Sequence, residues 1–170
     1  YIGGSGNDGL NDSGLKYNYG DQFRGEIILD DNGFVYVSST SQSVDFPTVS
    51  GTQGSLNGTQ DAVVFKMPIA LNVLSWSTYF GGPGVETGNS VQIGNNGDVF
   101  IAGGTTSSSL PFNSGYDQVY GGASDGYLAR FNGVNGGILS GTYIGLGEYD
   151  QAYFVQLDID DKVYVLGQSE

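Results

Sequence analysis

The chain has no cysteine and no histidine, two residue types on which many active sites depend. Disulfides and thiolate metal sites are therefore excluded, and the commonest general base and metal ligand is missing. Basic residues are scarce too, with 5 Lys and Arg against 18 Asp and Glu and a formal net charge of −13. Nucleic acids and anionic membrane surfaces both attract clustered Lys and Arg, so the composition argues against either partner. No apolar run approaches membrane-spanning length, and we expect no membrane insertion.

Sustained helical periodicity is also absent. The apolar segments are short, rich in Val, Ile, Tyr and Phe, and separated by clusters of Gly, Asn, Asp and Ser, which is the pattern of strands and turns. In the middle of the chain we expect strands at Ser90–Ile93, Val99–Gly103, Gly126–Phe131 and Leu139–Ile144. Asn96-Gly97 joins the first two, and Gly33 ends the corresponding corner earlier in the chain. Both glycines are predicted to supply the positive φ of a tight hairpin turn.

A spacing of 64 residues recurs along the whole chain. Val35-Tyr36-Val37 returns as Val99-Phe100-Ile101 and again as Val163-Tyr164-Val165 (99 − 35 and 163 − 99). Two further pairs of landmarks keep the same offset: Asp61-Ala62-Val63 with Asp125-Gly126-Tyr127, and Thr78-Tyr79-Phe80 with Thr142-Tyr143-Ile144. Because landmarks from different elements share one offset, each repeat is expected to be one structural unit stacked on the next.

Four short antiparallel strands per unit, with Gly-rich junctions, are typical of a β-propeller blade. The predicted fold class is therefore all-β, with four-stranded antiparallel blades of a partial propeller; a β-solenoid suits the pattern less, because its rungs are shorter and usually parallel. Residues 1–21 are expected to hold the last strand of a preceding blade and an inserted junction loop, 22–85 and 86–149 one blade each, and 150–170 the first half of another. Since about two and two-thirds units do not close a propeller, we expect a segment of a longer protein.

The first junction is longer than the others. From Tyr79 to Glu86 is 7 residues, whereas from Tyr1 to Gln22, which stands 64 before Glu86, is 21. The junction therefore holds 14 extra residues, polar and Gly-rich, between Gly6 and Gln22. Insertions in repeat proteins often bind partners, so Gly6–Asp21 is predicted to be a partner-contact surface that can be deleted without unfolding the blades. A tolerated surface excursion is the alternative.

Several motifs, taken in order, resemble the SBBP family of β-propeller repeats. They are Tyr1-Ile2-Gly3-Gly4-Ser5-Gly6-Asn7-Asp8, Gly33-Phe34-Val35-Tyr36-Val37, Asp45-Phe46-Pro47-Thr48, Asp61-Ala62-Val63-Val64-Phe65-Lys66 and Trp76-Ser77-Thr78-Tyr79-Phe80-Gly81-Gly82. The resemblance covers essentially the whole chain. The second unit departs from it, with Leu110-Pro111-Phe112 in place of Asp-Phe-Pro-Thr and Gly145-Leu146 in place of Gly-Gly.

The SBBP family occurs in large secreted or surface-exposed bacterial proteins, often of Bacteroidetes, beside adhesive modules and a type IX secretion signal. The resemblance implies an extracellular or cell-surface scaffold that binds a protein or a surface glycan, or spaces other domains. It also implies further blades of the same parent chain. No catalytic, cofactor-binding or metal-binding residue is transferred, because the family motif contains none.

Acidic residues recur at the blade junctions and at the hairpin corners. Those at the junctions are Asp8, Glu86 and Asp150, and those at the corners include Asp30, Asp31 and Asp160. We expect each junction carboxylate to order its loop by accepting backbone N–H bonds, and the corners to be solvated. Calcium binding is the alternative. Gly3–Asn11 matches the nonapeptide of calcium-binding β-rolls, but it stands alone where that chemistry needs consecutive copies. No other cofactor is predicted.

Two function classes remain. The first is a binding or spacing module, and the second is the propeller platform of a secreted carbohydrate-active hydrolase or lyase whose active site lies mostly outside this segment. Glycosidase chemistry needs two carboxylates facing across a cleft, and nothing in the sequence singles out such a pair. Asp61 and Asp125 recur at equivalent strand starts, which favours a turn-closing role. Trp76, Tyr79 and Tyr143 are predicted to pack between blades, and we predict a non-enzymatic protein.

Overall fold

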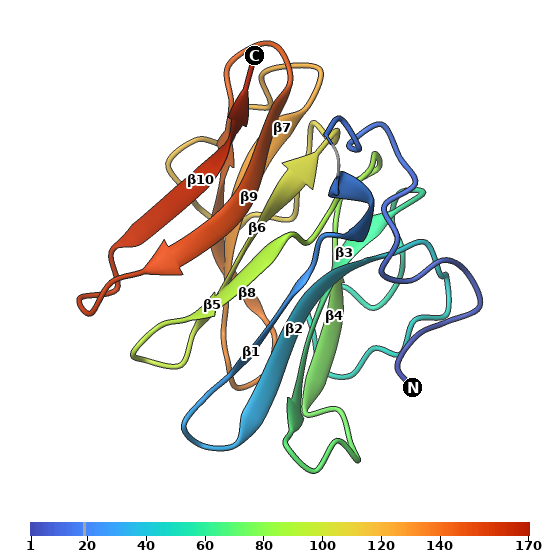
Figure 1. Cartoon of the computed structure of the whole chain (residues 1–170), viewed down its shortest axis with the longest axis vertical. Coiled ribbons are helices and arrows are strands. Elements are labelled where there is room, and N and C mark those ends of the chain that lie inside the picture. Colours follow the sequence, from blue (N-terminus) through green and yellow to red (C-terminus); the bar gives the residue numbers. More distant parts are fainter. Residues whose placement is uncertain (19) are drawn as a thin grey trace.

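The computed structural model describes residues 1–18 and 20–170, which form ten strands in three antiparallel sheets (Figure 1). One 3-10 turn, η1 (Asp21–Phe23), precedes the first strand, and no α-helix occurs in the described residues. Accordingly, no helix among them is long and apolar enough to cross a membrane. The all-β fold class with four-stranded antiparallel sheets is confirmed. Tyr19, part of the predicted insert, lies outside the described residues.

The first two sheets are four-stranded meanders, in which strands that follow one another along the chain are also neighbours in the sheet. The first sheet consists of β1 (Glu26–Leu29), β2 (Phe34–Ser41), β3 (Asp61–Pro68) and β4 (Trp76–Phe80). The second consists of β5 (Ser90–Ile93), β6 (Val99–Thr105), β7 (Asp125–Phe131) and β8 (Ile138–Ile144). The third sheet holds two strands, β9 (Asp150–Leu157) and β10 (Val163–Ser169).

The 64-residue period is present in the strand pairing as well as in the sequence. Tyr36 of β2 pairs with Lys66 of β3, and one period later Phe100 of β6 pairs with Arg130 of β7. The strand predicted at Ser90–Ile93 has the observed bounds of β5, and the other three predicted strands lie inside β6, β7 and β8. The repeat therefore preserves the register of strand pairing.

The hairpin corners confirm the predicted turn glycines. Gly33 has φ 78° and Gly97 has φ 84°, so both lie in the left-handed region that favours glycine. The third corner places Asp161 at the same position with φ 60°. Asp tolerates this conformation better than most residues, and the turn is kept without a glycine.

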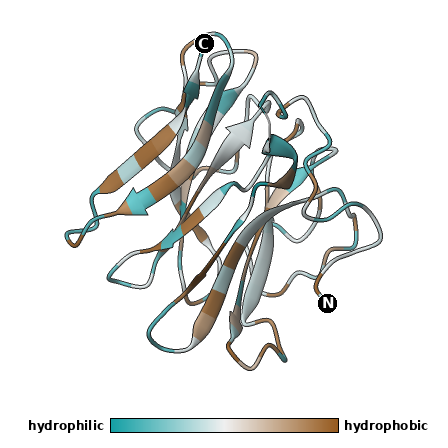
Figure 2. Cartoon of the chain, in the orientation of Figure 1, coloured by the Kyte–Doolittle hydropathy of each residue, from teal (hydrophilic) through white to brown (hydrophobic). Residues whose placement is uncertain are grey.

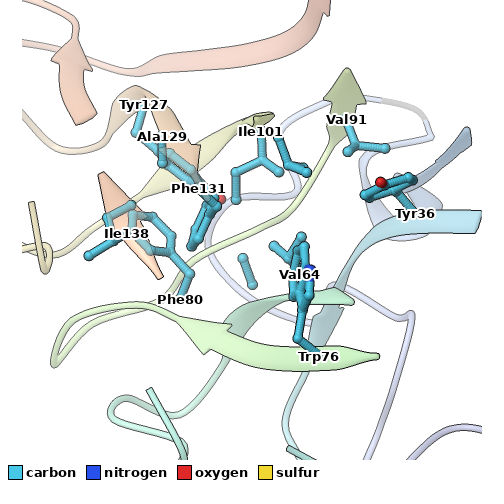
Figure 3. Packing of buried hydrophobic residues seen from close by; sticks show 12 residues of the cluster. Tyr36, Val64, Trp76, Phe80, Val91, Ile101, Tyr127, Ala129, Phe131 and Ile138 are labelled. Carbon is cyan, nitrogen blue, oxygen red and sulfur yellow. The ribbon is translucent and has the colours of Figure 1, made fainter. Parts of the chain in front are cut away.

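The first two sheets pack face to face around a shared aromatic core. Phe80 of β4 lies with its ring centroid 5.1 Å from that of Tyr127 and 5.5 Å from that of Phe131, both on β7. Figure 3 shows these side chains gathered with Trp76 and Val64 between the two sheets. The Trp76 indole N–H donates to the Gly133 carbonyl at 3.1 Å, which satisfies its buried polar group. The packing role predicted for Trp76 is confirmed.

The first strands of the three sheets follow one another across the molecule. β1 contacts β5, and β5 contacts β9, so the first strands lie next to each other. Residues 81–89 and 145–149 lead from the last strand of one sheet to the first strand of the next. Residues 1–7, expected to end a strand of a preceding blade, form no strand here, and Asp8 makes a single bridge with Ser41 of β2.

Candidate functional site

The three junction carboxylates occupy equivalent places in the fold. Each lies opposite the last residue of a second strand: Asp8 opposite Ser41, Glu86 opposite Thr105, and Asp150 opposite Ser169. Asp8 is therefore the structural counterpart of Glu86, although 78 residues rather than 64 separate them (86 − 8). The difference places the 14 extra residues after Asp8.

Each junction carboxylate orders the loop in front of it. It accepts a hydrogen bond from the backbone N–H four residues earlier, at 2.7 Å for Gly4 to Asp8, 2.8 Å for Gly82 to Glu86 and 3.0 Å for Leu146 to Asp150. In the first two junctions it also accepts from a strand-end hydroxyl, Ser41 at 2.5 Å and Thr105 at 2.6 Å. The expectation that these carboxylates accept backbone N–H bonds is confirmed. Asp8, the aspartate of the nonapeptide motif, therefore uses its two carboxylate oxygens for hydrogen bonds within the protein.

Glu86 is the most enclosed of the three, with 0% of its surface exposed. Burial raises the pKa of Glu86 to about 7, outweighing the hydrogen bonds from Ser107, Thr105 and Gly82 that act in the opposite direction. A carboxyl group with such a pKa could serve as a general acid if substrate reached it. Both of its oxygens already hold protein hydrogen bonds in an enclosed site, so the geometry indicates a structural group.

Asp61 and Asp125 close the turns before β3 and β7. Asp61 accepts from the N–H of Asn57 at 2.9 Å, and Asp125 accepts from the N–H of Gly121 at 2.9 Å. The predicted turn-closing role is confirmed for both. Burial raises the pKa of each carboxyl, and for Asp125 the nearby Asp150 adds to the effect.

Each turn-closing carboxylate converges with a junction carboxylate on one glycine. A Cβ built on Gly81 would lie 2.4 Å from Glu86 Oε2 and 2.5 Å from Asp61 Oδ1. At Gly145 the corresponding distances are 2.7 Å to Asp150 Oδ2 and 2.9 Å to Asp125 Oδ1. The absence of a side chain at each glycine thus lets the two carboxyl groups lie against the backbone at this point, where a Cβ would clash with both. In the sequence, the approach of the two carboxylates is marked by the glycine directly after the fourth strand of each sheet, Gly81 or Gly145.

Asp125 Oδ1 is buried without a hydrogen bond. The nearby Gly122 N–H lowers the pKa of Asp125 without reaching hydrogen-bonding geometry with this oxygen. In the described residues no group of three or more His, Cys, Asp or Glu side chains could hold a metal ion. The hydrogen bonds from Gly4, Gly82 and Leu146 give the three junction carboxylates a structural role.

The acidic hairpin corners use one carboxylate each to hold the turn. Asp30 accepts from the Phe34 N–H at 2.8 Å and from the Tyr36 hydroxyl at 3.0 Å, and Asp158 accepts from Tyr164 at 3.1 Å. Burial opposes ionisation of Asp30, but these hydrogen bonds outweigh it and the pKa is lowered. Asp31 and Asp160 are exposed.

Neighbouring hairpin tips enclose a polar hollow that the sequence did not reveal. It has a volume of about 480 Å³ and lies between the β1–β2 and β5–β6 corners, where Asp31, Asn32 and Asn96 are exposed. The next tip follows directly, because the Asn95 N–H donates to the Asp161 carboxylate at 2.9 Å. Figure 1 shows these tips on one side of the molecule. Carboxylate and amide groups at such a hollow can hydrogen-bond sugar hydroxyls or polar peptide groups.

The N-terminal insert is part of the folded structure and not a free loop. Its extra residues fall within 10–24, because Gly9 pairs with Thr40 as Thr87 pairs with Gly104. Leu15 is fully buried, and its carbonyl accepts from the Tyr149 hydroxyl at 3.2 Å and from Gln151 Nε2 at 2.5 Å. Tyr17 also lies against Tyr149, with ring centroids 4.6 Å apart.

These contacts join the insert to the third sheet and the segment that leads to it. Arg24 adds a cation–π contact, 4.0 Å from the ring centroid of Tyr153 on β9. Deletion of the insert, predicted above to leave the blades folded, would also expose these buried contacts with β9, so the insert has a structural role that the sequence analysis did not assign to it. No short sequence pattern signals a contact between residues about 130 positions apart.

The sequence was compared with known protein families and with curated proteins. No family model matches the chain. No curated protein matches it either. The SBBP resemblance therefore rests on the motifs quoted above.

Proposed function

We propose that this chain is a β-propeller segment of a large secreted or cell-surface bacterial protein, where it binds a protein or a surface glycan or spaces neighbouring modules without chemistry of its own. It belongs, in this proposal, to the SBBP type of repeat, and further blades of the parent chain complete the propeller. In the first two sheets the four antiparallel strands follow the chain order, which supports a blade arrangement because propeller blades are four-stranded antiparallel sheets. The contacts of β1 with β5 and of β5 with β9 agree with it.

The observation that carries the binding role is the hollow between adjacent hairpin tips. Unlike the junction carboxylates, whose oxygens hold protein hydrogen bonds, Asp31 and Asn32 present exposed polar groups at a recess of about 480 Å³. Asn96 is also exposed there, and its side-chain amide is held by two hydrogen bonds with Asp98. A partner with several hydroxyl or amide groups fits this chemistry. The acidic surface, with a net charge of −13, favours neutral or cationic partners.

A glycan array combined with binding to candidate surface proteins tests the proposal. Asp31→Ala together with Asn32→Ala should weaken binding about tenfold or more, since polar groups left unpaired at a recognition site cost about 1–3 kcal/mol. Glu148→Ala is the matched control, because it removes one exposed acidic side chain away from the hollow. An equal loss of binding in the double variant and in Glu148→Ala would mean that binding depends on net charge and not on the hollow.

Two outcomes would contradict the proposal. One is hydrolase or lyase activity that a single carboxylate substitution within the chain abolishes, which would favour a carbohydrate-active enzyme. The other concerns the cellular setting: cell fractionation should find the parent protein outside the cell or on its surface, and confinement to the cytoplasm would refute that half.

A further inference from the structure

The turn-closing aspartates Asp61 and Asp125 hold equivalent places but receive different numbers of hydrogen bonds. Asp61 accepts three, from two backbone N–H groups at 2.9 Å and 3.2 Å and from Gln53 Nε2 at 2.6 Å. Within the described residues Asp125 accepts one, from the Gly121 N–H at 2.9 Å, and the nearby Gly122 N–H does not reach hydrogen-bonding geometry with its Oδ1. Asp125 is 1% exposed. Since a buried carboxylate is costly without compensating partners, this group needs another source of stabilisation.

One difference between the two units removes a donor from Asp125. Gln53 and Asp117 stand 64 residues apart (117 − 53), and the N–H of each donates to a threonine hydroxyl of the fourth strand at 2.9 Å. Gln53 gives Asp61 an amide donor, whereas Asp117 has only carboxylate oxygens, one of which accepts from the Val119 N–H at 2.9 Å. The counterparts of all three donors of Asp61 are present in the second unit, so the difference lies within that unit.

The unpartnered Oδ1 of Asp125 lies among other acceptors. A Cβ built on Gly145 would lie 2.9 Å from this oxygen and 2.7 Å from Asp150 Oδ2. A Cβ built on Gly121 would lie 3.6 Å from it and 2.6 Å from the Leu146 carbonyl oxygen. Because oxygen acceptors repel one another without a hydrogen between them, this arrangement favours a protonated carboxyl group.

The titratable groups that face Asp125 come from each element around it. Burial raises the pKa of Asp125 most, and the negative charges of Asp150, on β9, and Asp117, in the loop before β7, raise it further. The pKa values of Tyr120 in that loop and Tyr143 on β8 are raised by burial, and the charge of Asp125 adds to the effect. Figure 2 shows the start of β9, where Asp150 lies, as hydrophilic, in contrast with the hydrophobic bands further along the strand.

The five basic side chains have their polar contacts elsewhere in the described part of the chain. Four of them form ion pairs: Lys16 with Asp12, Arg24 with Asp21, Arg130 with Asp98, and Lys162 with Asp158 and Asp160. The fifth, Lys66, donates to the Gly133 carbonyl at 3.1 Å. A proton on one carboxyl group of the second junction supplies both a donor and a positive charge.

We propose that the second junction is a proton-binding site, in which Asp125 carries a proton on Oδ1 and donates it toward the oxygens of Asp150 and Leu146. The proton replaces the donor that Gln53 gives to the first junction, and it removes one of three neighbouring negative charges. At the first junction, where Gln53 is present, burial raises the pKa of Glu86 to about 7. The residue at the position of Gln53 and Asp117 thus determines how tightly the turn-closing carboxyl group holds a proton.

The proton links the second and third sheets in acid. Asp125 begins β7 and Asp150 begins β9, and the Asp150 N–H donates to the Ser124 carbonyl at 2.9 Å. Because the folded state binds the proton more tightly than the unfolded chain does, its contribution to stability is complete below pH 3.8 and is lost as the pH rises through the raised pKa of Asp125. Above that pKa the two ionised carboxyl groups repel each other across the junction.

NMR of the side-chain carboxyl carbons between about pH 3 and pH 8 tests the site directly. Asp125 should titrate above 3.8, the ordinary pKa of aspartate. Its midpoint should fall by about one pH unit in Asp117→Asn, which removes a negative charge without changing the size of the side chain. Asp117→Gln, which copies the first unit, should lower the midpoint as well. A midpoint at or below 3.8, or one that neither variant moves, would overturn the proposal.

The reciprocal substitution in the first unit is the matched comparison. Gln53→Glu replaces the side-chain donor of Asp61 by a carboxyl group and should raise the titration midpoint of Asp61. The midpoint of Asp125 should stay as it is in the unsubstituted chain, and unchanged amide shifts of β6 show that the sheets are folded. An Asp61 midpoint that Gln53→Glu leaves unchanged would refute the role assigned to this position.

Hydrogen exchange of the Asp150 N–H tests the link between the sheets. Its protection factor, which corrects for the intrinsic pH dependence of exchange, should fall severalfold as the pH rises through the midpoint of Asp125. The fall should be smaller in Asp117→Asn. The same pH profile in both proteins would contradict the link.

Calcium is tested as the other ligand of the same carboxyl groups. It is added at about 1 mM, within the range in which extracellular modules bind it. The carboxyl carbons of Asp117, Asp125 and Asp150 should not shift at neutral pH, because a proton and not a metal ion neutralises the junction. Calcium-dependent shifts of these three carbons would assign the site to a metal ion and overturn the proposal.

Discussion

β6 and β10 are the same strand of two successive units, and they differ mainly in what covers them. Both follow a hairpin corner, and both begin with Val, an aromatic residue and a β-branched residue. β6 lies between β5 and β7 and is buried along its length, whereas β10 has one neighbour and is largely exposed. The burial of a strand in this fold is therefore set by its neighbours in the array and not by its own sequence.

The junctions show the opposite behaviour, because they are alike wherever they occur. Asp8, Glu86 and Asp150 each accept the N–H four residues earlier. These hydrogen bonds are local, so each unit forms them without help from the next. Two kinds of interaction thus stabilise the molecule. The hydrogen bonds within each junction are local and recur in every unit, whereas the side-chain packing between sheets forms only where a neighbouring sheet is present.

The largest predicted effect comes from truncating the core between the first two sheets. Phe80→Ala should lower the free energy of unfolding by about 3–5 kcal/mol, because the side chain is buried among Tyr127, Phe131 and Phe112. Its counterpart substitution, Ile144→Ala, should cost no more than about 1 kcal/mol, since that side chain is partly exposed beside a hollow. Urea unfolding followed by tryptophan fluorescence measures both. An equal loss of unfolding free energy in Phe80→Ala and Ile144→Ala would contradict the claim that the core around Phe80 is more tightly packed than the surroundings of Ile144.

A pH-dependent effect should follow from Glu86. Its pKa is raised from 4.5 to about 7 in the folded state, so the folded protein holds this proton more tightly than the unfolded chain does. The resulting stability is present below pH 4.5 and is lost as the pH rises through 7, by up to about 3 kcal/mol. Glu86→Gln should therefore flatten the decline in stability between pH 5 and pH 8.

The raised pKa values of Asp61 and Asp125 act in the same direction and leave a smaller slope in that variant. Asp12→Asn is the matched control, because it removes one exposed carboxylate outside the Glu86 site. A Glu86→Gln protein whose stability falls with pH as steeply as the wild type would contradict the assignment of this proton to Glu86.

A smaller effect distinguishes the hairpin corners. Gly97→Ala should destabilise the chain by about 1 kcal/mol, because φ 84° is unfavourable for a residue with a Cβ although nothing lies near that atom. Asp161→Gly should instead change stability by less than about 0.5 kcal/mol, since relief at φ 60° is offset by loss of the bond to Asn95. Thermal melts of the two variants would show the order, and a larger loss for Asp161→Gly would contradict it.

Much of the fold could be predicted from the sequence because its determinants are local and repeated. The offset between Val35, Val99 and Val163 located the strands, and Asn-Gly located the turn at Gly97. The N–H bonds to Asp8 and Glu86 followed from the same reasoning, since a carboxylate in a Gly-rich loop finds backbone donors within a few residues.

The remaining features depend on contacts between distant parts of the chain. The burial of Leu15 against Tyr149 and Gln151 joins the insert to the third sheet, and nothing in the composition of a polar, Gly-rich loop signals that neighbour. Likewise, the pKa of Glu86 depends on complete burial at the junction of two sheets. The hollow between the hairpin tips also arises only when two units are placed side by side.

Amide hydrogen exchange of the three equivalent strands tests the central claim most directly. In the chain of 170 residues we predict slow exchange throughout β6 and in the paired residues of β2, and exchange at least about tenfold faster at the outward amides of β10, because those amides have no partner strand. Protection of β10 equal to that of β6 would contradict the claim that neighbouring strands, and not strand sequence, determine how each unit is stabilised.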